Sequence, residues 1–299
     1  MSWISSLWQF SRPHTIIGTT LSILALYFIA LSNGNILITS INLTQLLGVW
    51  IACICGNIYI VGLNQLEDIE IDKINKPELP LASGALSKEQ GKWIVIITGL
   101  IALIISGLLG TYLLATVTIS LIIGTAYSLP PIRLKQFPFL AAFCIFTVRG
   151  VVVNLGLFLH LSQTFAGESV LPLSVWTLTL FIVVFTIAIA LFKDVPDLEG
   201  DKQFNISTFS ILLGKLSIFN LSRWIITFCY LGMIIAGIFW LPAINSAFII
   251  VSHLILLALL WWRSQNVDLE EKSAIVSFYQ FIWKLFFLEY LLFPLAYFV

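Results

Sequence analysis

The segment LTQLLGVWIACICGNIYIVGLNQLEDIEID, residues 43–72, places an uncharged apolar run directly before a cluster of acids. A helix that crosses a bilayer needs about 20 mostly apolar residues, so residues 43–63 are predicted to span a membrane. The acids that follow are predicted to lie where this helix reaches the membrane surface. The segment therefore predicts a membrane protein with polar chemistry at one end of a helix.

The rest of the chain has the same apolar character. Its 299 residues are 59% hydrophobic and 10% charged, whereas roughly 25% of the residues of a soluble domain are charged. Hydropathy predicts a polytopic all-α bundle of nine helices in the lipid bilayer. The predicted spans are residues 15–33, 43–63, 92–110, 112–129, 139–160, 172–192, 221–240, 244–262 and 277–298. Because no linker or change of composition marks a soluble part, residues 1–299 are expected to form one domain.

The basic residues indicate the orientation of the bundle. Apart from Arg149 and Lys284, the lysines and arginines lie before the first span or around the loops that follow spans two, four, six and eight. Since Lys and Arg are retained on the cytoplasmic side, these loops and the N-terminus are predicted to be cytoplasmic and the C-terminus to lie outside. The net charge of +0 offers no basic surface for nucleic acid.

The loop after span two is rich in acids. Asn64, Asp68 and Asp72 are spaced four residues apart. If the helix of span two continues beyond the membrane surface, these three side chains share one face of it. Glu67 and Glu70 are predicted to turn away from that face.

A second acidic segment follows span six. Asp194, Asp197 and Asp201 stand at positions i, i+3 and i+7, so a continuing helix would again bring them to one face. The Asp-x3-Asp spacing of the first loop recurs here at Asp197 and Asp201. Two such helix ends, four spans apart, indicate a parallel duplication with a site between its halves.

Carboxylates that face one cavity require cations between them. Two carboxylates about 4 Å apart repel each other by about 4 kcal/mol at an effective dielectric constant of about 20. Mg²⁺ prefers oxygen ligands and is usually held by one or two carboxylates together with substrate phosphates. The alternative is that the acids are solvated loop charges balanced by nearby lysines, but two copies of one spacing favour a metal site for a diphosphate. The predicted metal ligands are Asn64, Asp68, Asp72, Asp194, Asp197 and Asp201.

Span five contains a charge that needs a partner. A charged side chain near the middle of a bilayer costs at least about 2.5 kcal/mol and is a candidate functional residue. At about 1.5 Å per residue, Arg149 lies at a depth similar to that of Glu289 in span nine. A buried Arg149–Glu289 ion pair is the first interpretation. Binding of an acceptor carboxylate by Arg149 is the second.

The motifs resemble the paired signature of the UbiA superfamily of membrane prenyltransferases. The resemblance is carried by Asn-x3-Asp-x3-Asp at 64–72, Asp-x3-Asp at 197–201, Arg12-Pro13, and YSLPPIRLK at 127–135, and it extends over the whole chain. More narrowly, NQLEDIEIDKINKPELPLASG (64–84), FKDVPDLEGD (192–201) and FYQFIWKLFFLEYLLFPLA (278–296) resemble the homogentisate prenyltransferases of tocopherol and plastoquinone biosynthesis. The greatest resemblance is to the cyanobacterial homogentisate phytyltransferases.

This resemblance implies transfer of a phytyl group from its diphosphate to homogentisate, with loss of CO2 and diphosphate, to give a methyl-prenyl-benzoquinol for tocopherol (vitamin E) synthesis. It implies that Asn64, Asp68, Asp72, Asp197 and Asp201 are the catalytic ligands of Mg²⁺ and diphosphate. Many members of the superfamily have an arginine where this chain has Leu79, so another cation is expected to take its place. The expected diphosphate-binding residues are Lys73, Lys76, Tyr127, Arg133, Lys135 and Lys193, and the expected acceptor-binding residues are Arg12 and Arg149. Tyr127 is equally consistent with an ordinary interfacial tyrosine.

Two other functions stay open. One is prenyl transfer to an acceptor of the plastoquinone, chlorophyll or ubiquinone type. The other is transport, since charges in mid-membrane also serve ion pathways, although acids gathered at one surface favour an enzyme. The expected location is a plasma or thylakoid membrane: the basic loops predict that the Asp motifs lie on the cytoplasmic side, and the resemblance implies a thylakoid membrane. Prenyl chain length and oligomeric state are not determined by the sequence.

Overall fold

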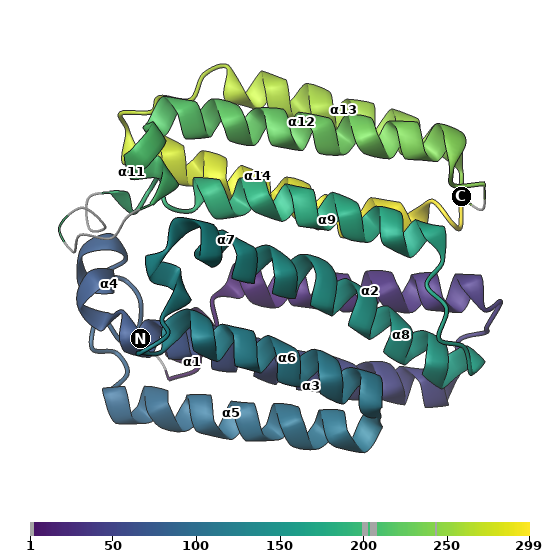
Figure 1. Cartoon of the computed structure of the whole chain (residues 1–299), viewed down its shortest axis with the longest axis horizontal. Helices are drawn as coiled ribbons and strands as arrows, with labels where there is room; N and C mark the ends of the chain where they lie inside the picture. The colour runs from purple at the N-terminus through teal and green to yellow at the C-terminus, as the bar shows by residue number, and fades with distance from the viewer. Residues whose placement is uncertain (1–2, 199–202, 204–207, 243) are drawn as a thin grey trace.

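The computed structural model describes residues 3–198, 203, 208–242 and 244–299, and within these residues every regular element is helical (Figure 1). Nine of the described helices are long and apolar enough to cross a membrane. Each of them overlaps one of the nine predicted spans, which confirms the all-α polytopic prediction.

The nine spanning elements and the short helices between them follow the chain in order. The spanning elements are α2 (Pro13–Asn33), α3 (Ser40–Glu67), α5 (Lys88–Leu109), α6 (Thr111–Ser128), the continuous run of α7 (Pro138–Phe146), η2 (Thr147–Val152) and α8 (Val153–Ala166), then α9 (Leu173–Phe192), α12 (Lys215–Phe239), α13 (Ser246–Ser264) and α14 (Lys272–Leu295). The short helices are α1 (Trp3–Phe10), α4 (Ile69–Asn75), η1 (Leu134–Gln136) and α11 (Phe209–Leu213).

Local sequence sets the ends of several spans. Ser87 begins α5 with a capping box, because its hydroxyl accepts from the Gln90 N–H while the Gln90 side chain accepts from the Ser87 N–H. At the other end of α5, Gly110 alone separates it from α6 and adopts φ +147°. A side chain rarely tolerates this conformation, so glycine permits the immediate reversal of the chain.

The two ends of the bundle differ. In Figure 1 the helices run roughly parallel, and α1, α4 and α11 gather at the end that holds the N-terminus, while the C-terminus lies at the opposite end. The acidic segments after α3 and α9 belong to the N-terminal end. The polar chemistry of the chain is therefore concentrated at one end of the bundle.

Burial distinguishes the inner spans from the outer ones. In the most apolar part of α9, 67% of the residues are buried, whereas the corresponding share is 22% in α5 and in α13. Large apolar side chains of α5, such as Ile97, Leu100, Ile104 and Leu108, are exposed on the bundle. In a bilayer these side chains face lipid, so α9 is a central helix and α5 a peripheral one.

Candidate functional site

A cavity of about 870 Å³ opens at the N-terminal end of the bundle. It is lined by residues from α3, α4, the connection between α6 and α7, and the segment that follows α9. Both acidic segments therefore face one shared space, as the sequence predicts. Of the predicted residues, the lining includes Arg12, Asn64, Asp68, Asp72, Lys76, Tyr127, Arg133, Lys135, Lys193, Asp194 and Asp197.

The first acidic segment is not one continuous helix. The sequence predicts that α3 continues to Asp72, but α3 ends at Glu67 and Asp68 leaves the helical conformation at φ −111°, ψ 19°. The i to i−4 hydrogen bonds nevertheless persist, because the Asp68 N–H donates to the Asn64 carbonyl at 3.1 Å and the Asp72 N–H to the Asp68 carbonyl at 2.7 Å. The prediction of a straight helix is wrong, while the three side chains still line the same cavity.

Asp68 is the most heavily paired acid of the site. Its carboxylate accepts hydrogen bonds from Lys135 Nζ at 2.6 Å, Asn64 Nδ2 at 3.0 Å and Arg133 Nη2 at 3.2 Å. Burial lowers the pKa of Lys135, although the carboxylate beside it opposes that change. Two cations on one carboxylate leave an excess of positive charge that an anionic ligand can use.

Asp72 is the opposite case. Its side chain is buried, with 6% exposure, and its Oδ2 atom has no hydrogen-bond partner. Burial raises the pKa of Asp72 to about 6, against the opposing effects of Arg12 and Lys76. An unpartnered carboxylate oxygen in a buried position is costly, and a bound cation would remove that cost.

The second acidic segment is irregular. The prediction that the helix of span six continues is wrong, because α9 ends at Phe192 and turns follow from Lys193. Asp194 pairs with the adjacent Lys193 at 2.7 Å, and Asp197 pairs with Lys76 from the first acidic segment. The Lys76–Asp197 ion pair joins the two segments directly. Asp201 lies outside the residues that the structure describes.

Some residues lie elsewhere than the sequence predicts, and some residues that line the cavity were not predicted. Lys73 pairs with Glu70 at 2.7 Å, is half exposed and does not line the cavity. Glu67 and Glu70 border the cavity instead of turning away from it. Sequence reasoning did not single out Lys88 or Tyr279, which also line it. Both belong to the beginnings of spanning helices, where a lysine or a tyrosine is common and gives no signal of its own.

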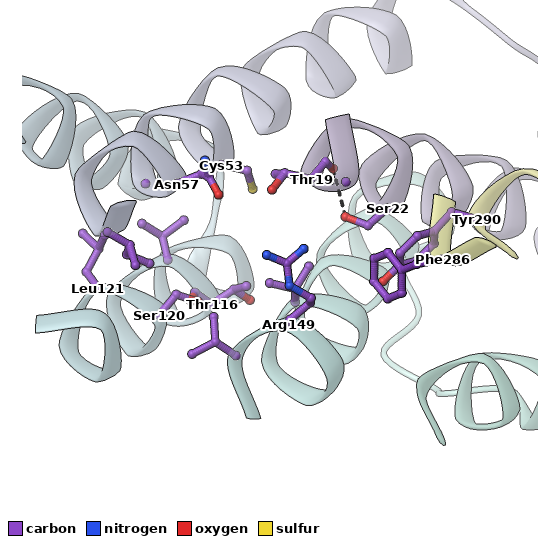
Figure 2. Close-up of a pocket in the computed structure, with 16 residues that line it drawn as sticks. Thr19, Ser22, Cys53, Asn57, Thr116, Ser120, Leu121, Arg149, Phe286 and Tyr290 are labelled. Atoms are coloured by element: carbon purple, nitrogen blue, oxygen red, sulfur yellow. Dashed lines mark hydrogen bonds between the residues drawn. The ribbon is translucent and has the colours of Figure 1, made fainter. Parts of the chain in front are cut away.

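The predicted Arg149–Glu289 pair is wrong. Glu289 Oε2 instead contacts His253 Nε2 at 3.0 Å, and both of these side chains are fully buried. Arg149 lies over the ring of Trp283, with 4.8 Å from its Cζ to the ring centroid. It lines a separate cavity of about 100 Å³ that Figure 2 shows in close-up. Equal depth in the bilayer did not reveal that the two residues face different parts of the bundle.

The acids do not form a closed metal cage. In the described part of the chain, no three His, Cys, Asp or Glu side chains are close enough to hold a metal ion together. Asp68 is instead paired with Lys135 and Arg133, and Asp197 is paired with Lys76. Asp72 keeps one oxygen without a hydrogen-bond partner. The donor set of carboxylates and an amide is the oxygen-rich chemistry that Mg²⁺ prefers.

Comparison with known sequences identifies relatives. The profile of the UbiA prenyltransferase family matches residues 15–285. The chain is 58% identical to homogentisate phytyltransferase of Synechocystis, over 99% of this chain and 96% of that one. It is 42% identical to homogentisate phytyltransferase 1 of Arabidopsis thaliana, over 97% of this chain and 75% of the relative.

Comparison with solved structures identifies the same fold. A UbiA homologue from Archaeoglobus fulgidus, solved with GPP and Mg²⁺, superposes with a TM-score of 0.65 at 17% identity, over 98% of this chain and all of the other. A digeranylgeranylglyceryl phosphate synthase also gives 0.65 at 21% identity, over 99% of both chains.

Proposed function

The chain belongs to the UbiA prenyltransferase family, and from this premise we propose that it transfers a phytyl group from its diphosphate to homogentisate for tocopherol synthesis. The choice of both substrates follows the similarity to the homogentisate phytyltransferases of Synechocystis and Arabidopsis. The observation that carries the proposal is the cavity of about 870 Å³, in which two acidic segments and several lysines and arginines face each other. This combination suits a metal-bound diphosphate.

The acids would hold Mg²⁺. Asp72 offers a buried oxygen without a partner, and Asn64 and Asp68 stand beside it in the cavity. Asp194 and Asp197, with Asp201 as a further candidate, would supply the second set of ligands. The Mg²⁺ found with an archaeal member of the fold supports this assignment. When bound, the metal would neutralise the diphosphate and make it a better leaving group.

The cations of the cavity would bind the diphosphate. Lys135 and Arg133 contact Asp68, and Lys76 contacts Asp197, so each can pass from a carboxylate to a phosphate oxygen when metal takes the carboxylate. Lys193 can do the same from Asp194. Such charge-assisted bonds stabilise the negative charge that develops on the leaving group. These four residues would provide the positive charge of the arginine expected from the superfamily pattern at the position of Leu79.

The bond changes balance as follows. The C–O bond between the allylic carbon and the diphosphate breaks, and both electrons leave with the diphosphate. A ring carbon of homogentisate forms the new C–C bond to the allylic carbon and loses its proton. The carboxyl carbon leaves as CO2, and the methylene carbon that remains takes up one proton and becomes the methyl group. The apolar bundle around the cavity excludes water, which would otherwise capture the allylic cation.

The proposal includes a location in the cell. The chain is an integral multi-pass membrane protein. The basic loops indicate that the site faces the cytoplasm, and the chloroplast relative supports a photosynthetic membrane.

Purified protein in lipid nanodiscs provides the test. It is incubated with Mg²⁺, homogentisate or another aromatic acid, and phytyl, geranylgeranyl or solanesyl diphosphate. We expect a methyl-phytyl-benzoquinol from homogentisate and phytyl diphosphate, and its loss when EDTA is added. Preference for another acceptor would change the substrate assignment. Substrate uptake by proteoliposomes without any prenylated product would contradict the enzyme.

A further inference from the structure

Arg149 carries a charge that none of the described residues neutralises. It lies in the turn η2, within the continuous run of α7, η2 and α8 that crosses the membrane. Among the described residues, no carboxylate lies within ion-pair distance of it, and its guanidinium contacts the rings of Trp283 and Phe286 at 4.8 and 5.9 Å. Aromatic faces stabilise a cation only in part. A charge kept in mid-membrane at this cost indicates a function and an anionic partner.

The guanidinium points into the cavity of about 100 Å³ (Figure 2). Since about 10–15 Å³ suffices for one water molecule, this space admits a larger polar group. Its lining includes polar side chains, with Thr19 from α2, Asn57 from α3, and Thr116 and Ser120 from α6. Gly18 leaves room for the arginine, because a Cβ atom there would lie 3.3 Å from Arg149 Nη1.

A distortion of the helix places Arg149. The turn Thr147–Val152 is a π-helix, in which some backbone carbonyls lose their ordinary partners. Asn154 compensates, because its Nδ2 donates to the carbonyls of Gly150 at 2.7 Å and Arg149 at 3.2 Å. The Asn154 Oδ1 atom in turn accepts from the Tyr290 hydroxyl at 3.0 Å. Asn154 and Tyr290 thus hold the turn that carries the arginine.

An aromatic ring connects this cavity with the larger one. The ring of Trp283 contacts Arg149 and also lies 4.9 Å, centroid to centroid, from the ring of His14. His14 and Tyr279 line the large cavity, and Tyr279 also contacts Trp283. Arg149 and the wall of the large cavity are therefore in contact with the same ring, that of Trp283.

We propose that the cavity around Arg149 binds the carboxylate of the aromatic acceptor, with its ring directed towards the large cavity, and that Asn154 and Tyr290 are positioning residues that fix Arg149. This inference rests on the proposed function, in which the acceptor is an aromatic acid. It explains why the arginine has no carboxylate of its own: the substrate supplies it. Thr116 and Ser120 already donate their hydroxyl hydrogens to the carbonyls of Tyr112 and Thr116, so their oxygens, together with the Asn57 Oδ1 atom, are left to accept from ring hydroxyls.

The test separates recognition of the carboxylate from every other step. Equilibrium binding of radiolabelled homogentisate is measured on wild type, Arg149→Gln, Asn154→Leu and Tyr290→Phe in nanodiscs. KM is then measured for homogentisate and for phytyl diphosphate. Methylhydroquinone, which lacks the carboxylate, is tested as an inhibitor. Arg223→Gln is the matched control, because Arg223 also lies in a spanning helix over two aromatic rings but lines neither cavity.

We expect Arg149→Gln to weaken homogentisate binding and raise its KM by roughly 10- to 100-fold, the value of one lost charge-assisted contact. Asn154→Leu should raise this KM by roughly tenfold, and Tyr290→Phe by a few-fold. KM for phytyl diphosphate and inhibition by methylhydroquinone should stay unchanged in all three, which a merely misfolded site would not produce. Arg223→Gln should behave as wild type.

An unchanged affinity of Arg149→Gln for homogentisate would overturn the inference, as would an equal loss in Arg223→Gln. A wild type that does not bind homogentisate overturns it as well. A wild type that binds homogentisate through Arg149 but transfers no prenyl group to it would support the binding site and contradict the proposed function.

Discussion

The two acidic segments share a sequence spacing but are held in different ways. In the first, Asp68 forms ion pairs with Arg133 and Lys135 from the connection between α6 and α7. Asp72 is buried, and its Oδ2 atom has no hydrogen-bond partner. In the second, Asp194 forms an ion pair with the adjacent Lys193, and Asp197 forms one with Lys76 from the first segment. The first segment is thus fixed by a third part of the chain. The second is fixed by its neighbour and by the first.

The acids of the two segments are therefore equally spaced in sequence but not equally preorganised to bind a metal ion. Under the proposed function, the buried oxygen of Asp72 would be ready for a cation before any ligand arrives, whereas Asp197 would first have to release Lys76. Metal at the first segment and diphosphate between the segments would therefore be coupled through Lys76. Substitutions that affect one segment at a time can test this order.

Replacement of Asp68 or Asp197 by alanine should have the largest effect. Each change removes a carboxylate that faces the shared cavity, so we expect a loss of prenyl transfer of at least roughly 10³-fold. Circular dichroism and thermal unfolding should show an intact fold in both variants. Near-normal activity of either one would mean that its segment does not take part in the reaction.

Asp72→Asn and Asp194→Asn should separate the two segments. We expect the affinity for Mg²⁺ to fall by roughly 100-fold in Asp72→Asn, because the free oxygen is its most available ligand, and by roughly tenfold in Asp194→Asn, whose carboxylate already has Lys193. Isothermal titration with Mg²⁺ and a non-hydrolysable prenyl diphosphate analogue measures both. Equal losses would remove the distinction drawn between the segments.

The pH dependence of metal binding should carry the signature of Asp72. Its pKa is raised to about 6, so the protonated form competes with metal below that pH. Above about pH 7 the carboxyl is already ionised, and affinity should no longer change. We expect Mg²⁺ affinity to fall by up to about tenfold for each pH unit below 6. Titrations from pH 5 to 8 should show this slope in wild type and a weaker one in Asp72→Asn.

Lys135→Met and Lys73→Met should differ although both are lysines of the acidic end. Lys135 contacts Asp68 inside the cavity, whereas Lys73 does not line the cavity and pairs with Glu70 at its border. We expect KM for phytyl diphosphate to rise by roughly tenfold in Lys135→Met and to stay within about twofold in Lys73→Met. Steady-state kinetics at saturating homogentisate decides between them, and a larger effect of Lys73→Met would place the diphosphate elsewhere.

The fold and the members of the site followed from the sequence to different degrees. All nine spans could be predicted, because an apolar run of bilayer length has few other folded states. The cavity-lining acids were predictable from their spacing. The break at Asp68 was not, since hydropathy averages over a window and does not report a single backbone angle.

Contacts between distant spans were the least predictable. Depth along the membrane follows from counting residues, but the direction in which a side chain faces around the bundle depends on packing. His253, Arg149 and Glu289 all lie inside spans. Only the packing of α13 against α14 shows that Glu289 contacts His253 and not Arg149. The Lys76–Asp197 contact likewise joins residues far apart in sequence.

The π-helical turn in the fifth span has a consequence for how such proteins can diverge. This turn accommodates one surplus residue. As a result, α7 keeps its alignment with the cavity of about 870 Å³, while α8 keeps its own alignment with the bundle interior. Deleting a single codon between Thr147 and Val152 would restore regular winding between the two halves of the span and move the side chains of the turn, Arg149 among them, to new positions around the helix. The guanidinium would then be aimed at a new wall without any exchange of amino acids, which offers gene evolution a short route to a different acceptor.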